Sequence, residues 1–202
     1  MRLVFHAFRP KLLACIERNT APEFPTAAEQ TSHQLYAGAD LERNAAMSNK
    51  TLTVAKELLD RLNRVNPSVT PMQLLKLVYV AHGYMLGIHG RPLLDEEVEA
   101  WQYGPVVRSV YDAVKQYRSN PIEKITVRSP VDLDSDEVAV LDRVARNYGK
   151  HSGVTLSSAT HKPGTPWSVT WGMGDGKNSV ISNDVIEEFY DRLLKQGKHS
   201  TL

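Results

Sequence analysis

Residues 71–86 form an almost continuously apolar segment, and this segment constrains the fold more than any other feature of the sequence. Thr70 precedes it as a candidate N-cap, and Pro71 occupies the first helical position, where proline is readily accommodated. Gly87 and Gly90 mark its end. Its apolar side chains cover more than one helical face: Leu74, Leu75, Leu77, Val78, Val80, Ala81, Tyr84, Met85 and Leu86. Because such a helix must be surrounded by other elements, we expect residues 71–86 to be a central, buried helix.

The flanking segments predict a helical domain around this centre. Residues 51–64 place apolar side chains at i, i+3, i+4 spacing, which is typical of an amphipathic helix. Further helices are expected at residues 106–117, at 138–148 after a start signal at 134–137, at 156–161 and at 183–196. Residues 98–101 should be extended up to a break at Gly104-Pro105, and alternation over 122–127 predicts a short strand. The predicted fold class is mainly α, a compact helical domain with a short β element.

Residues 1–46 differ in character from the rest of the chain. They contain Pro22 and Pro25, and no apolar period is sustained through them. The amphipathic pattern begins only after Met47, which could itself be the true start of the protein. Two interpretations stay open: an upstream sequence from a mis-called start, or a disordered arm. We therefore expect a poorly structured N-terminal extension, 1–46, before a helical domain, 47–202.

Charge and cysteine content narrow the classes of partner. The 24 basic and 23 acidic residues leave a formal net charge of +1, so nucleic-acid binding is not favoured. No apolar run approaches the ~18 residues that a membrane-spanning helix needs. The one cysteine, Cys15, cannot form an internal disulfide, which fits a reducing compartment. These features predict a cytoplasmic protein that does not engage a membrane.

A DNA-binding regulator is one alternative that the residues suggest. The predicted helices 51–64 and 71–86 are joined by a short turn, as in a helix-turn-helix motif. A recognition helix must offer polar and basic side chains to the major groove, however. The second helix carries only Lys76 as a clear cation, and we interpret it as a core helix.

A hydrolase or metalloenzyme is the other alternative, with His82, His151 or His161 as its working residues. A zinc site needs about three or four ligands at a recognisable spacing, and no such spacing of histidine or cysteine is present. No Gly-x-Ser-x-Gly motif supports a serine nucleophile either. We expect no catalytic residues, no metal and no cofactor.

Aromatic residues gather at two places in the chain. Trp101, Tyr103 and Tyr111 form the first group, and Trp167 and Trp171 form the second. Such residues serve both to fill cores and to anchor protein interfaces. The sequence leaves these two roles open.

Several short motifs follow one another in an order that resembles a known family. Residues 70–79 resemble its Leu-x-Lys-Leu-hydrophobic-Tyr helix, and residues 99–107 with Tyr111 resemble its most recognisable box. Leu156-Ser157, Thr160-His161 and Pro166-Trp167 resemble its third block, and Asn178 with Ile181-Ser182 completes the series. Over about Thr51–Leu194, the chain resembles the Panacea domain family, also called the SocA-like antitoxin domain and related to the phage-associated protein GepA.

The resemblance implies an antitoxin role with no catalytic residues. Members of the family neutralise varied toxins by direct binding, often on phages and mobile elements, and one delivers its toxin to a ClpXP protease. The implied partners are a cognate toxin and a ClpXP-type protease, while the oligomeric state stays open. The expected partner-binding residues lie in the second and third motif blocks: Trp101, Tyr103, Gly104, Pro105, Val106, Tyr111, Thr160, His161, Pro166 and Trp167.

Overall fold

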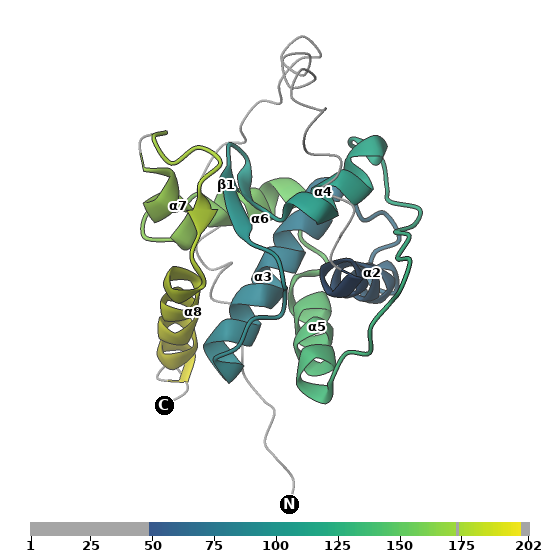
Figure 1. The fold of residues 1–202 in the computed structure, drawn as a ribbon, viewed down its shortest axis with the longest axis horizontal. Coiled ribbons are helices and arrows are strands. Elements are labelled where there is room, and N and C mark those ends of the chain that lie inside the picture. The colour runs from purple at the N-terminus through teal and green to yellow at the C-terminus, as the bar shows by residue number, and fades with distance from the viewer. Residues whose placement is uncertain (1–48, 173, 199–202) are drawn as a thin grey trace, which may run out of the picture.

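The computed structural model describes residues 49–172 and 174–198 (Figure 1). The predicted extension 1–46, with Cys15, and the candidate start at Met47 lie outside the described residues. The helices are α2 (Asn49–Asn63), α3 (Pro71–His89), α4 (Arg108–Val114), the short 3-10 turn η3 (Lys115–Tyr117), α5 (Ser135–Tyr148), α6 (Gly153–Thr160), α7 (Pro166–Trp171) and α8 (Asn183–Lys198). The strands are β1 (Val98–Trp101), β2 (Gly104–Val106) and β3 (Val180–Ile181). The prediction of a mainly helical domain with a short β element is confirmed.

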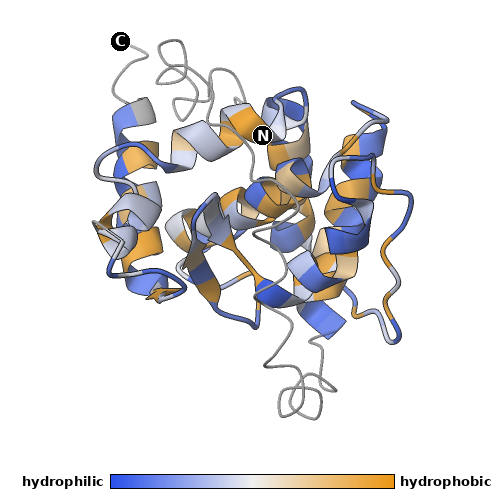
Figure 2. Ribbon diagram, turned by 90° about the horizontal axis from the view of Figure 1, so that it is seen from above, coloured by the Kyte–Doolittle hydropathy of each residue, from blue (hydrophilic) through white to orange (hydrophobic). Residues whose placement is uncertain are grey.

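Helix α3 is the centre of the domain, as the apolar segment predicts. Helices α2, α5, α6 and α8 all pack against it, and hydrophobic segments gather in the middle of the domain (Figure 2). The helix runs to His89, past the predicted end, because Gly90 adopts a left-handed conformation (φ 63°) and donates its N–H to the Leu86 carbonyl. Thr70 is the N-cap residue, but its side chain makes no capping hydrogen bond. Within the described ranges, no helix is long and apolar enough to cross a membrane.

Helices α3 and α8 approach closely because glycines face the ring of Tyr190. A Cβ atom added at Gly83 would lie 2.1 Å from that ring, and one at Gly87 would lie 2.8 Å from the Tyr190 Cβ. The ring packs edge-on against Tyr79 and Tyr84 in the core. Its hydroxyl is buried and has no hydrogen-bond partner among the described residues. Burial among three other tyrosines raises the pKa of Tyr190 well above its ordinary range, so the phenol stays neutral.

We expect Tyr190→Phe to stabilise the domain. The substitution keeps the ring and removes a buried, unpartnered hydroxyl, so the free energy of unfolding should rise by about 1 kcal/mol. Tyr148→Phe is the matched control, because the hydroxyl of Tyr148 is hydrogen-bonded to that of Tyr84 and its removal should destabilise by a similar amount. Urea unfolding followed by circular dichroism measures both. A loss of stability in Tyr190→Phe would contradict the prediction.

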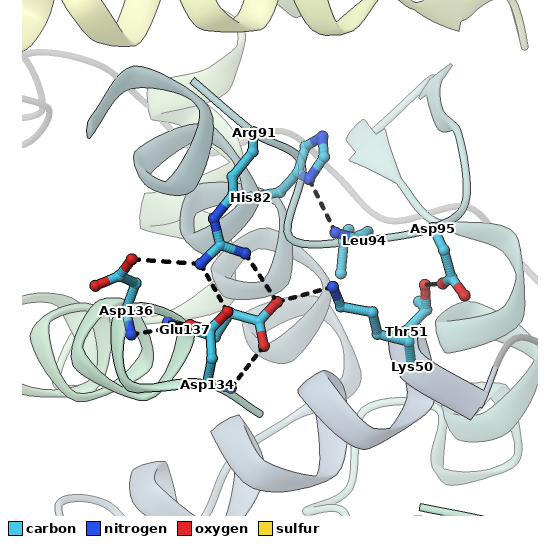
Figure 3. A network of polar contacts seen from close by, with 9 residues as sticks. All are labelled: Lys50, Thr51, His82, Arg91, Leu94, Asp95, Asp134, Asp136 and Glu137. Carbon is cyan, nitrogen blue, oxygen red and sulfur yellow. Dashed lines mark hydrogen bonds and ion pairs between the residues drawn. The ribbon is translucent and has the colours of Figure 1, made fainter. Parts of the chain in front are cut away.

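The start of α5 is fixed by a capping box and by ion pairs that reach other elements (Figure 3). Asp134 accepts the N–H groups of Asp136 and Glu137, and the Glu137 side chain accepts the N–H of Asp134. The buried Glu137 carboxylate also lies 2.8 Å from the Lys50 ammonium at the start of α2. Arg91, in the loop after α3, pairs with Asp134 at 2.7 Å. The start signal at 134–137 is confirmed, with the helix beginning at Ser135 and the network tying α2, α3 and α5 together.

One predicted element is wrong, one begins two residues later than predicted, and two were not predicted. Residues 122–127 form no strand. Ile122 and Ile125 are buried three residues apart, and the N–H of Ile122 bonds the Val69 carbonyl in a loop without forming a ladder. The helix expected from 106 begins at Arg108, because Gly104–Val106 pairs with β1 instead. Helix α7 and strand β3 were not predicted. For the two strands, pairing with a distant segment decides the backbone conformation, and the local pattern does not contain it. Helix α7 has a local start signal, the N-cap Thr165 followed by Pro166.

Candidate functional site

The residues of the recognisable box form a β-hairpin. Strands β1 and β2 are antiparallel, with Glu99 opposite Val106 and Trp101 opposite Gly104. Strand β3 pairs with the other edge of β1, so the strand order is β2-β1-β3. Gly104 has φ 104°, and a Cβ there would lie 2.7 Å from Thr160 Oγ1 and 2.9 Å from Lys76 Cε. A glycine is therefore required where the hairpin rests on α3 and α6.

Four side chains from beneath hold the backbone carbonyls of this hairpin. We call them the hairpin cradle. The pairs are Trp167 Nε1 with Trp101 O, His161 Nε2 with Gln102 O, Ser157 Oγ with Tyr103 O, and Lys76 Nζ with Pro105 O. The nitrogen–oxygen and oxygen–oxygen distances lie between 2.8 and 3.0 Å. Residues far apart in the sequence thus fix the turn in one conformation.

Lys76 is the most unusual member of the cradle. Its side chain is 1% exposed on the buried face of α3, and no carboxylate pairs with it in the ranges 49–172 and 174–198. Burial lowers the pKa of its ammonium group to about 7. Lys76, the one clear cation of the second helix in the helix-turn-helix alternative, lies inside the domain and does not face solvent.

His161 and Trp167 form the corner between α6 and α7. Their ring centroids are 3.8 Å apart, and His161 Nδ1 lies 2.7 Å from the Ser157 carbonyl oxygen. Thr165 caps α7 by accepting the N–H of Ser168, and it donates its hydroxyl to the Thr160 carbonyl. The third motif block therefore builds the support for the hairpin.

The outer side of the hairpin and the adjoining α4 and η3 carry two neighbouring aromatic rings with a cation at each end. We call Arg108, Trp101, Tyr111 and Lys115 the cation–aromatic row. The guanidinium carbon of Arg108 lies 5.4 Å from the Trp101 ring, the Trp101 and Tyr111 rings meet edge-on at 4.8 Å, and the Lys115 ammonium lies 6.0 Å from the Tyr111 ring. Glu99 binds both Arg108 and the indole N–H of Trp101. This row is half-exposed and held by its own contacts.

The structure divides the predicted partner-binding residues into two groups. The buried group consists of strand β2 of the hairpin and of residues in α6 and α7: Gly104, Pro105, Val106, Thr160, Pro166 and Trp167. The half-buried group reaches the surface: Trp101, Tyr103, Tyr111 and His161. Trp167 is only 6% exposed, so its substitution would disturb the core. Trp101 is therefore the residue to substitute in a test of partner binding.

Sequence reasoning missed Lys76, Ser157, Glu99, Arg108 and Lys115 as parts of this site. The signal for Lys76 was present, since it is a lone charge inside an apolar helix. Glu99 and Ser157 stand inside the motif blocks that resemble the family, but their roles, like those of Arg108 and Lys115, depend on contacts made only in the folded chain.

Two of the three histidines of the enzyme alternative, His82 and His161, make hydrogen bonds that hold other parts of the fold. His82 Nδ1 accepts the N–H of Leu94, and its Nε2 lies 2.9 Å from Asn183 Oδ1 (Figure 3 shows the Leu94 contact). Burial lowers the pKa of His82, and that of the half-buried His151 as well. Across the described residues, no three histidine, cysteine or acidic side chains gather to hold a metal ion.

The fold and the site define a helical domain with a small sheet whose hairpin is held from beneath. The antitoxin SocA-like, Panacea domain model matches residues 74–168, which include the whole cradle and the whole row. Antitoxin SocA of Caulobacter vibrioides (strain NA1000 / CB15N) is 34% identical over 128 residues, covering 57% of this chain and 67% of that protein. The chain belongs to the SocA-like Panacea domain family. No solved structure matches it significantly.

Loss of one cradle contact should measurably weaken the fold. In Trp167→Phe the aromatic ring stays but the donor to the Trp101 carbonyl is lost, so the free energy of unfolding should fall by about 1–2 kcal/mol. Trp171→Phe is the control, because Trp171 stacks on Trp167 at 5.1 Å but donates no hydrogen bond within the described part of the chain. Its effect should stay below about 1 kcal/mol. Equal losses in the two variants would contradict the importance of the contact.

Proposed function

We propose that this protein is an antitoxin that neutralises a cognate toxin protein by direct binding, and that it does so in the cytoplasm. The observation that carries the proposal is the hairpin cradle, which fixes a surface loop in one conformation through four side-chain contacts to its carbonyls. A binding loop that is already ordered loses little entropy on association. The relative named antitoxin SocA supports the same conclusion.

The contact surface in this proposal is the outer side of the hairpin with the start of α4. It presents Trp101, Tyr103, Arg108 and Tyr111, which are the residue types that dominate the binding energy of protein interfaces. The bidentate contact of Arg108 with Glu99 holds the guanidinium over the Trp101 ring. Buried Gly104, Pro105 and Val106 contribute by shaping the hairpin, without touching the partner.

Binding could lead either to sequestration of the toxin or to its delivery to a ClpXP-type protease. The half-life of the toxin in cells with and without that protease separates the two. Sequestration leaves the half-life unchanged, whereas delivery shortens it only when the protease is present.

The experiment that tests the proposal uses the product of the neighbouring gene. That product is expressed alone and then together with the full chain, and growth is followed. Growth arrest by the neighbour and recovery with the full chain are the expected results. A neighbouring gene product that does not arrest growth, or an arrest that the full chain does not relieve, would reject the proposal. The alternatives would then be an operon regulator or an enzyme using His82, His151 or His161.

A further inference from the structure

We infer that the segment of the toxin that docks on the cation–aromatic row is acidic, with carboxylates that bind Arg108 and Lys115. This inference rests on the proposed function and names the chemistry of the partner at the same site. It follows from three observations: the donors that Arg108 leaves unused, the outward position of Lys115, and the distribution of charge along the chain.

Glu99 holds the Arg108 guanidinium in place but uses only some of its hydrogen-bond donors. Its Nε and Nη2 donate to the two carboxylate oxygens of Glu99 at 3.0 and 2.8 Å. Among the described residues, no hydrogen bond reaches Nη1. The Arg108 side chain is 52% exposed, whereas that of Glu99 is 16% exposed. The guanidinium therefore faces solvent as a pre-oriented fork, the geometry that binds a carboxylate through two hydrogen bonds.

Lys115 repeats this arrangement at the other end of the row. Its ammonium group lies 2.7 Å from Asp112 and over the Tyr111 ring, with 54% of the side chain exposed against 35% for Asp112. At both ends the cation projects further than its own carboxylate. A partner that approaches the row meets two cations separated by two aromatic rings.

The distribution of charge along the chain also makes the region of the row basic. Residues 101–128 contain five basic and two acidic residues, although the whole chain is nearly neutral. The basic side chains of Arg118, Lys124 and Arg128 in this segment are exposed. Residues 183–191, at the start of α8, contain four acidic residues and no basic one. Helices α4 and α8 lie on opposite sides of α3 (Figure 1), so the α4 end of the row is the side that attracts an acidic partner.

A protein segment fits this surface better than a nucleic acid does. Glu99 and Asp112 stand beside the two cations of the row and would repel a continuous line of phosphates. The exposed parts of Trp101 and Tyr111 offer apolar contact between the charges. Spaced carboxylates on a partly apolar segment match both features.

Matched charge reversals on the full chain test the inference. Lys115→Glu is compared with Lys195→Glu, because Lys195 is also an exposed lysine, paired with Asp191 at 2.6 Å but on α8. The dissociation constant with the product of the neighbouring gene is measured by calorimetry at three salt concentrations. We expect Lys115→Glu to weaken binding by about tenfold or more and to flatten its salt dependence, and Lys195→Glu to change it by less than about twofold. Arg108→Gln and Arg192→Gln form a second matched pair with the same expectation.

Four outcomes would overturn the inference. Equal effects of the two lysine reversals would show that the charge of the row does not contribute to binding, and so would salt-independent binding of the wild-type chain. In both cases the wild-type chain still binds, so the proposed function would stand. Displacement of the toxin by duplex DNA at moderate salt would show that the row binds phosphates. Failure of the folded wild-type chain to bind at all would instead reject the proposed function, and the inference with it.

Discussion

Replacing Gly83 with leucine is expected to destabilise the folded domain severely. A Cβ atom at this position would lie 2.1–2.5 Å from three ring carbons of Tyr190, closer than real Cβ atoms approach other atoms. Helix α8 cannot simply tilt away at this point, because its backbone also rests on Gly87, with the Tyr190 carbonyl carbon 2.9 Å from a Cβ there. Overpacking of a tight core costs about 1–3 kcal/mol and sometimes more, a large share of the stability of a small domain.

A double-mutant cycle shows whether the loss of stability comes from the contact between residue 83 and Tyr190 or from a general sensitivity of α3 to substitution. Gly83→Ala and Tyr190→Ala are made singly and together, and unfolding is followed by circular dichroism in urea. Removal of the ring should make room for the added methyl group, so the double variant should be less destabilised than the sum of the single variants. Additive effects, or a Gly83→Leu protein with an unchanged unfolding midpoint, would contradict the close packing of α3 on α8.

Lys76→Met should stabilise the domain at neutral and lower pH. Burial lowers the pKa of Lys76 from 10.5 to about 7, so below pH 7 the native state holds a buried ammonium without a carboxylate partner. Between about pH 7 and 10.5 the unfolded chain binds a proton that the native state does not, so the stability of the wild-type protein rises with pH in this window. The gain from Lys76→Met should be on the order of 2–4 kcal/mol at pH 6 and should disappear by about pH 10.5.

Unfolding free energies at pH 6, 8 and 10 provide the measurement, with Lys150→Met as the exposed control. A gain in stability that does not change with pH, or a loss of stability at pH 6, would contradict a buried charge at Lys76.

The Lys76→Met variant also tests the cradle. Because it removes the donor to the Pro105 carbonyl, it should loosen the hairpin and weaken toxin binding while the protein becomes more stable.

Features that depend on neighbouring residues could be predicted from the sequence. The central helix follows from apolar side chains on most faces of residues 71–86, and the start of α5 follows from the spacing of Asp134 and Glu137, which form the capping box. The hairpin was harder to predict. Gly104-Pro105 is a typical helix start or chain break, and only its pairing with β1 makes it a strand.

The cradle could not be predicted, because its hydrogen bonds join residues 29 to 66 positions apart. A motif comparison found Thr160, His161 and Trp167 without showing that they lie beneath the hairpin. Whether Trp101 faced the core or solvent was likewise open. The structure shows a half-buried ring between Arg108 and Tyr111, and this arrangement makes Trp101 the residue on which the proposed interface depends.

Calorimetric titration of the product of the neighbouring gene with the full chain and with Trp101→Ala tests the proposed interface most directly. We expect wild-type binding, and a loss of about 30-fold or more in affinity for Trp101→Ala with an unchanged circular dichroism spectrum, since an interface anchor contributes about 2 kcal/mol or more. Trp171→Ala, which removes a half-buried tryptophan outside the row, should bind nearly as the wild type does. A folded Trp101→Ala protein that binds as tightly as the wild type would contradict the placement of the toxin on this hairpin.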